Sequence, residues 1–588
     1  MRAPDGICLS NDTMDKLHGM EIVKKSGHGK KVFLQFLTVV SLIAGHSTVQ
    51  AAFQLPEGEK ITNPIVIGRG IPQKEAYEAF DPRIGRNFSL KNLWMRADMR
   101  VRPEYRTNVC FGGGIGAAGQ CNAPGLAANN LPGKANDQFV QQMTRLGIGY
   151  DLSPDVNFYL EFIDSRTWGG NGTPVGANGA GNNGDPAIHT CGSTLVGSTP
   201  ANVRPACTLG IRAGYMLIRN FAGVQGLGLK AGRQYLVFGD QSLFGHFDWA
   251  NTGWSFDGVM LQYSTNIIDT HLGWFRTAET DLLQGATLGS GGPNIGGTGQ
   301  ARNAAGDADF IIFYNQIKAV PGFLIEPFYI YYKNNLGGGD VSFQGLGTPK
   351  HGNQTRHVIG NRVAMKKGYF DFSSEVVYQF GQMGDTADSA SSLCGDPGGE
   401  GKCLHINAWA TRNWIGYTAF NLPGKPRIAF NFDYASGDGR ANCTLSNGAY
   451  GACKTANTFE NFFPTNHIHM GYMDVMGWKN MMSFSGNFQA RLSPDDHIEI
   501  WYTNLHLANA KDNWYRASQG VYVFSQPGNT KTHIGDEIDV AWTHFFMHGM
   551  VAFQAGYGHL FPGSYISQNL GRRAVGQDWA YAQLWINF

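Results

Sequence analysis

The sequence predicts an all-β fold, a transmembrane antiparallel up-and-down β-barrel of about eighteen strands. Three observations predict it. Segments of roughly 9 to 14 residues, the length of a tilted membrane strand, alternate between apolar and polar side chains. Short turns containing Pro, Gly or Asp alternate with long stretches rich in Gly, Asn and Ser, and the chain ends on an alternating segment that finishes with Phe588. Nothing after residue 50 offers the uncharged apolar run of roughly 18 residues that a membrane helix needs.

The N-terminal region has the pattern of a secretory signal peptide. Four lysines between residues 24 and 31 precede an apolar stretch, and a small-residue cleavage pattern ends at Ala51. We therefore expect residues 1–51 to be a signal peptide, and a start at Met20 would give it a charged region of ordinary length. A short buried helix is the alternative. Residues 52–90, with four prolines and no strand pattern, are expected to be a periplasmic lead-in or a plug of the lumen.

Charge and composition limit the kinds of partner. Without residues 1–51, the 46 Lys and Arg fall to 40 and the 45 Asp and Glu to 41. This balance gives no support to a nucleic-acid partner, which would need a concentrated basic surface. The mean hydropathy of −0.24 is compatible with strands that place one face in lipid and the other in a wet lumen.

The cysteines indicate an oxidising compartment. Once Cys8 is removed with the signal peptide, eight cysteines remain as four pairs close in sequence: Cys110 with Cys121, Cys191 with Cys207, Cys394 with Cys403, and Cys443 with Cys453. An even number of locally paired cysteines in an exported chain favours disulfides. Metal binding is the rival interpretation, but no C-x-x-C pair occurs. We expect neither a metal site nor a cofactor.

Alternation is clearest in the first predicted strand, where apolar residues from Leu93 to Val101 alternate with the charged side chains of Arg96, Asp98 and Arg100. The barrel is expected to occupy residues 91–588. Its predicted strands are 92–106, 139–151, 155–166, 208–219, 226–238, 254–264, 267–279, 308–318, 322–334, 355–365, 368–382, 404–418, 425–436, 478–492, 496–506, 535–546, 550–561 and 578–588.

Turn lengths set the expected orientation. Short turns are predicted at 151–155, 319–322, 366–368, 421–424 and 492–496. With these in the periplasm, the long loops and all four cysteine pairs face outwards, and the loops could fold inwards to gate the lumen. The terminal Phe588 is of the kind that the barrel-assembly machinery reads. We expect a monomer, surrounded by lipid, in the outer membrane of a Gram-negative cell.

Several short motifs follow one another in a fixed order between residues 90 and 588. They are Gln142–Gly147 with Asp164–Trp168, Gly232–Gln234 with Phe238–Asp240, Phe247–Gly253, Ser255–Val259, Phe432–Asp438, Phe463–His467, Gly471–Asp474 and Gly558–Gly563. Together they resemble the alginate-export family of outer-membrane porins. The resemblance implies an eighteen-stranded barrel that exports the anionic polysaccharide alginate through a positively charged constriction, with periplasmic polysaccharide-export proteins as partners.

A pore for a polymer with one carboxylate per sugar should present cations, and the planar fork of arginine pairs well with carboxylates. By strand parity, the expected lumen arginines are Arg96, Arg100, Arg102, Arg145, Arg362 and Arg427, and Arg233 is added from a family-like motif. Their acidic counterparts are Asp98, Glu161, Asp257, Asp371, Glu375, Asp433, Glu537 and Asp539. The alternative is that these charges pair with one another and only keep the barrel rigid.

Two other functions remain open from the sequence. A diffusion or uptake porin for small solutes or anions is favoured by the cysteine pairs, which we do not associate with the alginate exporter itself. A barrel enzyme, or a structural or adhesive surface protein, is the other. Since neither an H-E-x-x-H nor a G-x-S-x-G motif occurs, we predict no catalytic residues and no enzyme.

Overall fold

The structure is a computed structural model that describes residues 92–111, 136–168, 209–251, 253–278, 308–334, 351–385, 403–439, 455–517, 521–523, 525–526, 528–570 and 573–587. The expected signal peptide, residues 52–90 and the terminal Phe588 lie outside these ranges. No helix in the described ranges is long and apolar enough to cross a membrane.

Eighteen long strands form the wall of the barrel, which confirms the predicted fold and strand count. They are β1 (Leu93–Arg106), β2 (Asp137–Ser153), β3 (Val156–Thr167), β4 (Leu209–Ile218), β5 (Leu227–Gln234), β6 (Phe256–Ser264), β7 (Ile268–Ala278), β8 (Ala308–Ile317), β9 (Phe323–Asn334), β10 (His351–Lys367), β11 (Phe370–Asp385), β12 (Cys403–Thr418), β13 (Arg427–Ala435), β15 (Met481–Arg491), β16 (Asp496–His506), β19 (His533–Phe546), β20 (Val551–Pro562) and β21 (Gln577–Asn587).

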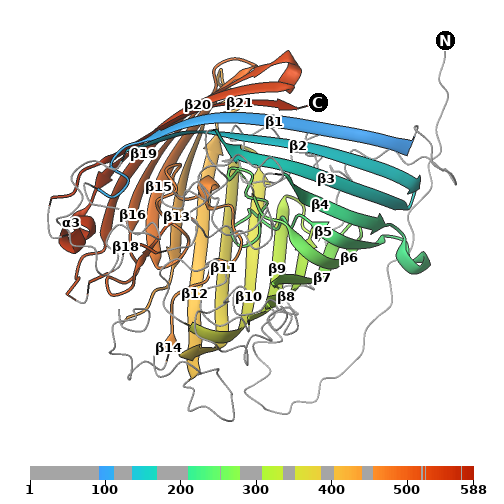
Figure 1. Ribbon diagram of the computed structural model, residues 1–588, viewed down its shortest axis with the longest axis horizontal. Helices are drawn as coiled ribbons and strands as arrows, with labels where there is room; N and C mark the ends of the chain where they lie inside the picture. The colour runs from blue at the N-terminus through green and yellow to red at the C-terminus, as the bar shows by residue number, and fades with distance from the viewer. Residues whose placement is uncertain are drawn as a thin grey trace, which may run out of the picture. The chain divides into compact units, whose positions relative to one another are not determined.

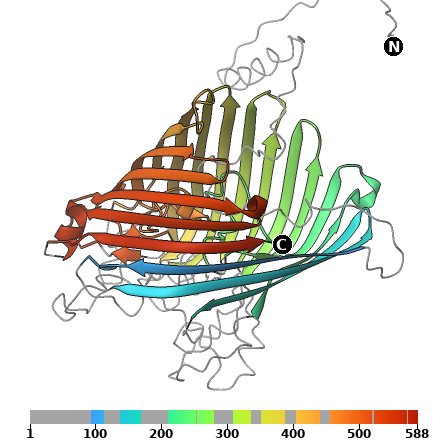
Figure 2. The same ribbon diagram turned by 90° about the horizontal axis from the view of Figure 1, so that it is seen from above.

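The barrel is closed because its first and last strands pair. Val101 of β1 lies opposite Leu584 of β21, and Met99 lies opposite Ile586. Figure 2 shows these two strands, blue and red, side by side. Every other wall strand pairs antiparallel with its neighbours along the chain, so the topology is up-and-down (Figure 1). The two-residue β14 (Thr455–Ala456) only adds a short parallel pair to β12.

Short turns join the strands at one rim, at all five predicted places. Ser153 caps the turn between β2 and β3, because its hydroxyl accepts hydrogen bonds from the backbone N–H groups of Asp155 (3.3 Å) and Val156 (3.1 Å). Gly322, with φ +79°, supplies the left-handed conformation that the turn between β8 and β9 needs. The strand ends that the long connections join lie at the opposite rim.

Side chains alternate between the two faces of the wall. In β21, Trp579, Tyr581 and Trp585 point inwards and are buried, whereas Leu584 points outwards and is exposed. The outer face carries many exposed large apolar residues, as a lipid-facing surface should.

Two long connections fold into the barrel and fill much of its described interior. We call residues 235–255 the first inward segment and residues 457–480 the second. They meet through backbone hydrogen bonds: Gly245 donates to the carbonyl of Phe463 (2.9 Å), and Phe463 donates to that of Leu243 (2.9 Å). Phe463 also packs against Phe256 and Phe310 of the wall, with ring centroids 5.0 and 6.1 Å away. The two segments therefore share one apolar core with the wall.

Smaller elements lie in or beside the connections. They are β17 (Trp514–Tyr515) with β18 (Val521–Val523), α3 (Ser564–Leu570), and the 3-10 turns η6 (Phe221–Gly223), η9 (Asn466–Ile468) and η10 (Met547–Gly549).

The predicted disulfide pairs fall largely on residues that the structure does not describe. Of the eight cysteines, Cys110, just after β1, and Cys403, at the start of β12, are described. The other six lie outside the described residues: Cys121, Cys191, Cys207, Cys394, Cys443 and Cys453. Each of the four predicted pairs has at least one member among these six. All four disulfide pairings therefore stay predictions.

Some wall glycines have an aromatic ring lying over them. A Cβ at Gly149 would be 2.0 Å from Cε2 of Trp94, whose indole is held by a 3.0 Å hydrogen bond to Asp151 and stacks on Tyr159. We expect Gly149→Ala to lower the free energy of unfolding by about 1–3 kcal/mol, because the ring must leave its place. Urea unfolding in lipid vesicles measures this. The control is Gly486→Ala, whose Cβ would meet nothing within 4 Å; equal stability of the two variants would contradict the close approach.

Candidate functional site

The inner face of β1 carries a row of charged side chains. Arg96, Asp98, Arg100 and Arg102 all have the inward parity that the sequence predicts, and Glu104 and Arg106 extend the row towards the long-loop rim. On the neighbouring strands Arg145 of β2 and Glu161 of β3 also face inwards. These side chains therefore form one cluster on the wall made by β1 to β3.

Much of this charge is neutralised within the wall. Arg145 Nε lies 3.0 Å from Asp98, Arg96 lies 3.0 Å from Glu161, and Arg102 Nε lies 2.7 Å from Glu104. The side chains of Arg102 and Arg145 are 2% and 1% exposed. Arg102 and Arg145 therefore do not line an open water path in this structure, since both contact the first inward segment and are buried.

The first inward segment contributes a carboxylate to the cluster. Asp248 accepts a hydrogen bond from Arg145 Nη1 (3.1 Å) through one oxygen and from Arg212 Nη2 (3.2 Å) through the other. Arg100 donates to three successive backbone carbonyls of the same segment, those of residues 248 (2.5 Å), 249 (3.2 Å) and 250 (3.2 Å). Burial alone would raise the pKa of the Asp248 carboxyl, but the cations around it, Arg145 first, hold that pKa well below its usual range.

Arg212 of β4 is a site residue that the sequence reasoning missed. A β-bulge explains this: Glu161 lies opposite Ala213 and Phe162 lies opposite Ile211, so Arg212 has no partner across the β3–β4 pair. The bulge turns Arg212 inwards, where it is fully buried, although strict alternation would have turned it towards lipid. Its other hydrogen bonds go to Ser255 (2.7 Å) and to the carbonyl of His246 (2.8 Å).

A stack of flat groups joins the wall to both inward segments. The Arg102 guanidinium lies 3.9 Å from the ring centroid of Trp249, and Trp249 stacks on His467 with centroids 3.8 Å apart. Arg102 also donates to the carbonyl of Trp249 (2.7 Å). Cation–π contacts of this kind stabilise most when water is excluded. The stack therefore fixes both segments to β1.

A second charged cluster lies on the wall from β9 to β13. Arg362 pairs with Glu326, Arg427 with Asp371 at 2.7 Å and Arg412 with Asp433 at 3.3 Å. Arg362 Nε also lies 4.0 Å from Asp240 of the first inward segment, and Ser242 of that segment donates to Glu375. The predicted residues Arg362, Arg427, Asp371, Glu375 and Asp433 are thus on the inner face, and Arg412 was missed.

A third cluster on β16 and β19 is acidic. Glu537 accepts a hydrogen bond from the backbone N–H of Met473 (3.0 Å), Asp539 accepts one from that of Tyr472 (3.2 Å), and Glu499 accepts from the Tyr472 hydroxyl. These contacts hold the second inward segment against the wall. Arginines of β1, β2 and β4 therefore bind the first inward segment, and carboxylates of β16 and β19 bind the second.

Two predicted lumen residues, Arg233 and Asp257, face the wrong way. They share the outer face with exposed Val259, and they pair with each other at 2.6 Å. The inner face of this sector carries Phe256 and Met260 instead, because the inward segments pack against it. The assumption that the polar face is the lumen face therefore fails here.

Arg233 and Asp257 begin a row of charges on the outside of the barrel. In register across five strands, Arg233 lies opposite Asp257, Asp257 opposite Arg276, Arg276 opposite Asp309, and Asp309 opposite Lys333. We call this row the outer charge ladder. It runs within two residues of the long-loop ends of β5 to β9. Thr270 lies on the same outer face of β7, six residues before Arg276. Its hydroxyl donates a hydrogen bond to Asn315 of β8 (2.9 Å).

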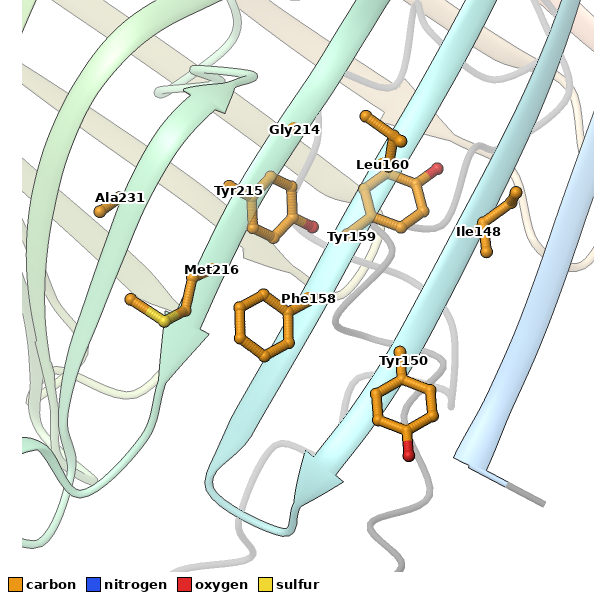
Figure 3. Close-up of a pocket in the computed structure, with 9 residues that line it drawn as sticks. All are labelled: Ile148, Tyr150, Phe158, Tyr159, Leu160, Gly214, Tyr215, Met216 and Ala231. Carbon is orange, nitrogen blue, oxygen red and sulfur yellow. The ribbon is translucent and has the colours of Figure 1, made fainter. Parts of the chain in front are cut away.

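Figure 3 shows a pocket in the wall of β2 to β5 that is not part of the charged site. It has a volume of about 370 Å³ and is lined mainly by apolar side chains, including Ile148, Phe158, Leu160 and Met216. Phe158 and Leu160 have the outward parity of β3. This pocket therefore belongs to the lipid-facing side.

A closed antiparallel barrel of eighteen strands, with an apolar outer face and a charged, segment-filled interior, defines the class of outer-membrane channel proteins. The family model described as alginate export matches residues 155–577 of the chain. The chain belongs to the alginate export family.

Solved structures of other outer-membrane proteins resemble the chain at low identity. Acinetobacter baumannii OccAB2 is 11% identical with a TM-score of 0.45, covering 84% of this chain and 98% of its own. Pseudomonas aeruginosa OccK8 (OprE) is 12% identical with a TM-score of 0.43 and the same coverage, and OccK2 (OpdF) in complex with glucuronate is 10% identical with a TM-score of 0.42, covering 85% and 97%. No curated protein matches the chain.

Proposed function

We propose that the channel passes an anionic polysaccharide such as alginate, and that the arginines of β1, β2 and β4 contact its carboxylates. The observation that carries the proposal is the excess of cations on this wall: Arg96, Arg100, Arg102, Arg106, Arg145 and Arg212 face the wall carboxylates Asp98, Glu104 and Glu161. A polymer with one carboxylate per sugar can exchange one arginine for the next along such a wall without being held too tightly to leave.

Passage requires that the inward segments move, because the first of them contacts Arg100, Arg102, Arg145 and Arg212, which are buried in the present structure. The segments are irregular chain held by apolar packing, hydrogen bonds and ion pairs, whereas the wall is also held by continuous strand pairing. The wall can therefore keep its shape while the segments leave it. Periplasmic polysaccharide-export proteins that deliver the polymer are the expected partners.

Reconstitution in planar bilayers tests the proposal. We expect anion-favouring conductance that purified alginate blocks and neutral dextran does not. The double variant Arg100→Gln/Arg102→Gln should lower the anion preference several-fold, since two wall cations are lost. Arg166→Gln is the control, because Arg166 lies on β3 outside the cluster and pairs with Asp164 at 2.5 Å. Cation selectivity with no effect of alginate would refute the proposal.

A diffusion porin for small solutes or anions is the second candidate. The packing of both inward segments against the wall favours it, since a path beside them is narrower than the empty barrel. Liposome swelling separates the two functions. Rapid swelling with monosaccharides and small organic anions, together with no block by alginate, would favour the diffusion porin.

A further inference from the structure

We propose that Arg145 and Arg212 form a carboxylate-binding site for the cargo, and that the Asp248 side chain occupies this site as an internal competitor. This inference rests on the proposed function and adds how that site is kept closed. The first inward segment would then hold itself in place by imitating the group that the channel transports.

The geometry of Asp248 is that of a bound ligand. One oxygen faces Arg145 at 3.1 Å and the other faces Arg212 at 3.2 Å, so two strands that are not neighbours grip one carboxylate from two sides. Guanidinium groups are suited to this planar recognition. A uronate carboxylate is chemically the same group as an aspartate carboxylate, so it fits the same donors.

The wall alone does not neutralise this site. Among the residues that the structure describes, no wall carboxylate lies within ion-pair distance of Arg212 or Arg100; Arg212 pairs only with Asp248, which comes from the segment. Asp98 on the wall pairs with Arg145, but Arg145 also reaches Asp248. Removal of the segment would therefore leave cations without a partner, which is the condition for binding another anion.

Donor atoms remain for a ligand larger than Asp248. Nη2 of Arg145, Nε of Arg212 and Nε of Arg100 are buried and have no hydrogen-bond partner among the described residues. A buried guanidinium N–H without a partner costs free energy. A sugar carboxylate with its neighbouring hydroxyls could satisfy these donors, which the short Asp248 side chain does not reach.

The bulge in β4 indicates that the site is built rather than accidental. It places Arg212 inside the barrel, against the strand alternation, at the level of Arg145 and the segment. Bulges often re-aim a side chain for function. The same arginine donates to Ser255, at the point where the segment rejoins the wall, so it contacts the segment at a second place.

The competition predicts which cargo opens the channel. A tethered carboxylate acts at an effective concentration in the range of about 1 mM, so a single uronate at low concentration displaces it poorly. A polymer presents many carboxylates to the same wall and can replace Asp248 repeatedly. We therefore expect polyuronates, rather than monomeric uronates, to release the first inward segment.

The test uses Asp248→Asn, which keeps the size of the side chain and removes its charge. We expect block of the reconstituted channel by a purified tetrauronate to tighten about ten-fold, because the charge-assisted competitor is gone. Basal anion conductance should rise as well. Asp257→Asn is the matched control, since this carboxylate pairs with an arginine on the outer face. The shift to slower mobility on heating, seen by gel electrophoresis, checks that each variant forms the barrel.

The outcomes separate the two proposals. If the wild-type channel is not blocked by uronates at all, the proposed function fails. If the wild type is blocked and Asp248→Asn is blocked with the same affinity, the carboxylate site is wrong while the proposed function stands. Loss of block in Arg212→Met, with block retained in Asp257→Asn, supports the site; unchanged block in Arg212→Met overturns it.

Discussion

Replacement of Arg145 by methionine is expected to lower the free energy of unfolding by about 3–5 kcal/mol, the usual cost of removing one partner from a buried ion pair. Arg145 lies between Asp98 of β1 and Asp248 of the first inward segment, at 3.0 and 3.1 Å, and its side chain is 1% exposed. Methionine fills a similar volume but takes the ion-pair partner from Asp98 and leaves Asp248 with Arg212.

Urea unfolding in lipid vesicles measures this loss, and Arg233→Met is the control. Arg233 also pairs with an aspartate, but that aspartate is 53% exposed on the outer face. Exposed pairs contribute about 0–1 kcal/mol. A double-mutant cycle with Asp98→Asn isolates the β1–β2 pair from the contact to the segment. A loss below about 1 kcal/mol in Arg145→Met would show that the cluster is hydrated and not buried as described.

Replacement of residues 240–251 by a short Gly–Ser linker is expected to raise single-channel conductance several-fold. The excised part carries the carboxylates and carbonyls that the wall arginines hold, and it carries Phe244, which stacks on Phe462 of the second segment with centroids 5.9 Å apart. The second segment thus loses its partner as well. The strand register does not depend on these residues, so the barrel should still form.

Planar-bilayer recordings measure the conductance. The control shortens the turn that contains η6, which joins β4 to β5 at the other rim and is largely exposed. If the linker variant conducts like the wild type while it forms a heat-modifiable barrel, the first inward segment does not restrict the path. A rise in the control variant of the same size would attribute the effect to loosening of the wall instead.

The strands could be predicted from the sequence because the side-chain period of two is imposed by lipid on one face. β21 is typical: Leu584 and Ile586 alternate with Trp585, and the structure places them on opposite faces. The short turns could also be predicted, because turn residues act locally. Ser153 bonds the backbone two residues further on, and Gly322 adopts the positive φ of its own turn.

The site was predicted only where strict alternation holds. Arg96, Arg100 and Arg145 obey it, and parity placed them on the inner face. Arg212 does not, because a bulge reverses the parity of β4 and leaves no clear mark in the sequence. Asp257 was misplaced because the inner wall near Phe256 is apolar, packed by segments that are distant in sequence. Irregular segments such as 235–255 have no repeating pattern of apolar and polar residues, so the sequence could not show which loops enter the lumen.

The outer charge ladder has a consequence for the membrane around the barrel. On β7, Arg276 and Thr270 are six residues apart, which is about 20 Å along a strand and about 15 Å along the membrane normal once the usual tilt is included. The apolar band of such barrels is ordinarily about 25 Å tall. The ladder is ionic and Thr270 is polar, so a hydrocarbon layer thinner than this band would match their spacing beside β7 and β8. We therefore expect the bilayer to be thinner on this side of the barrel than elsewhere around it.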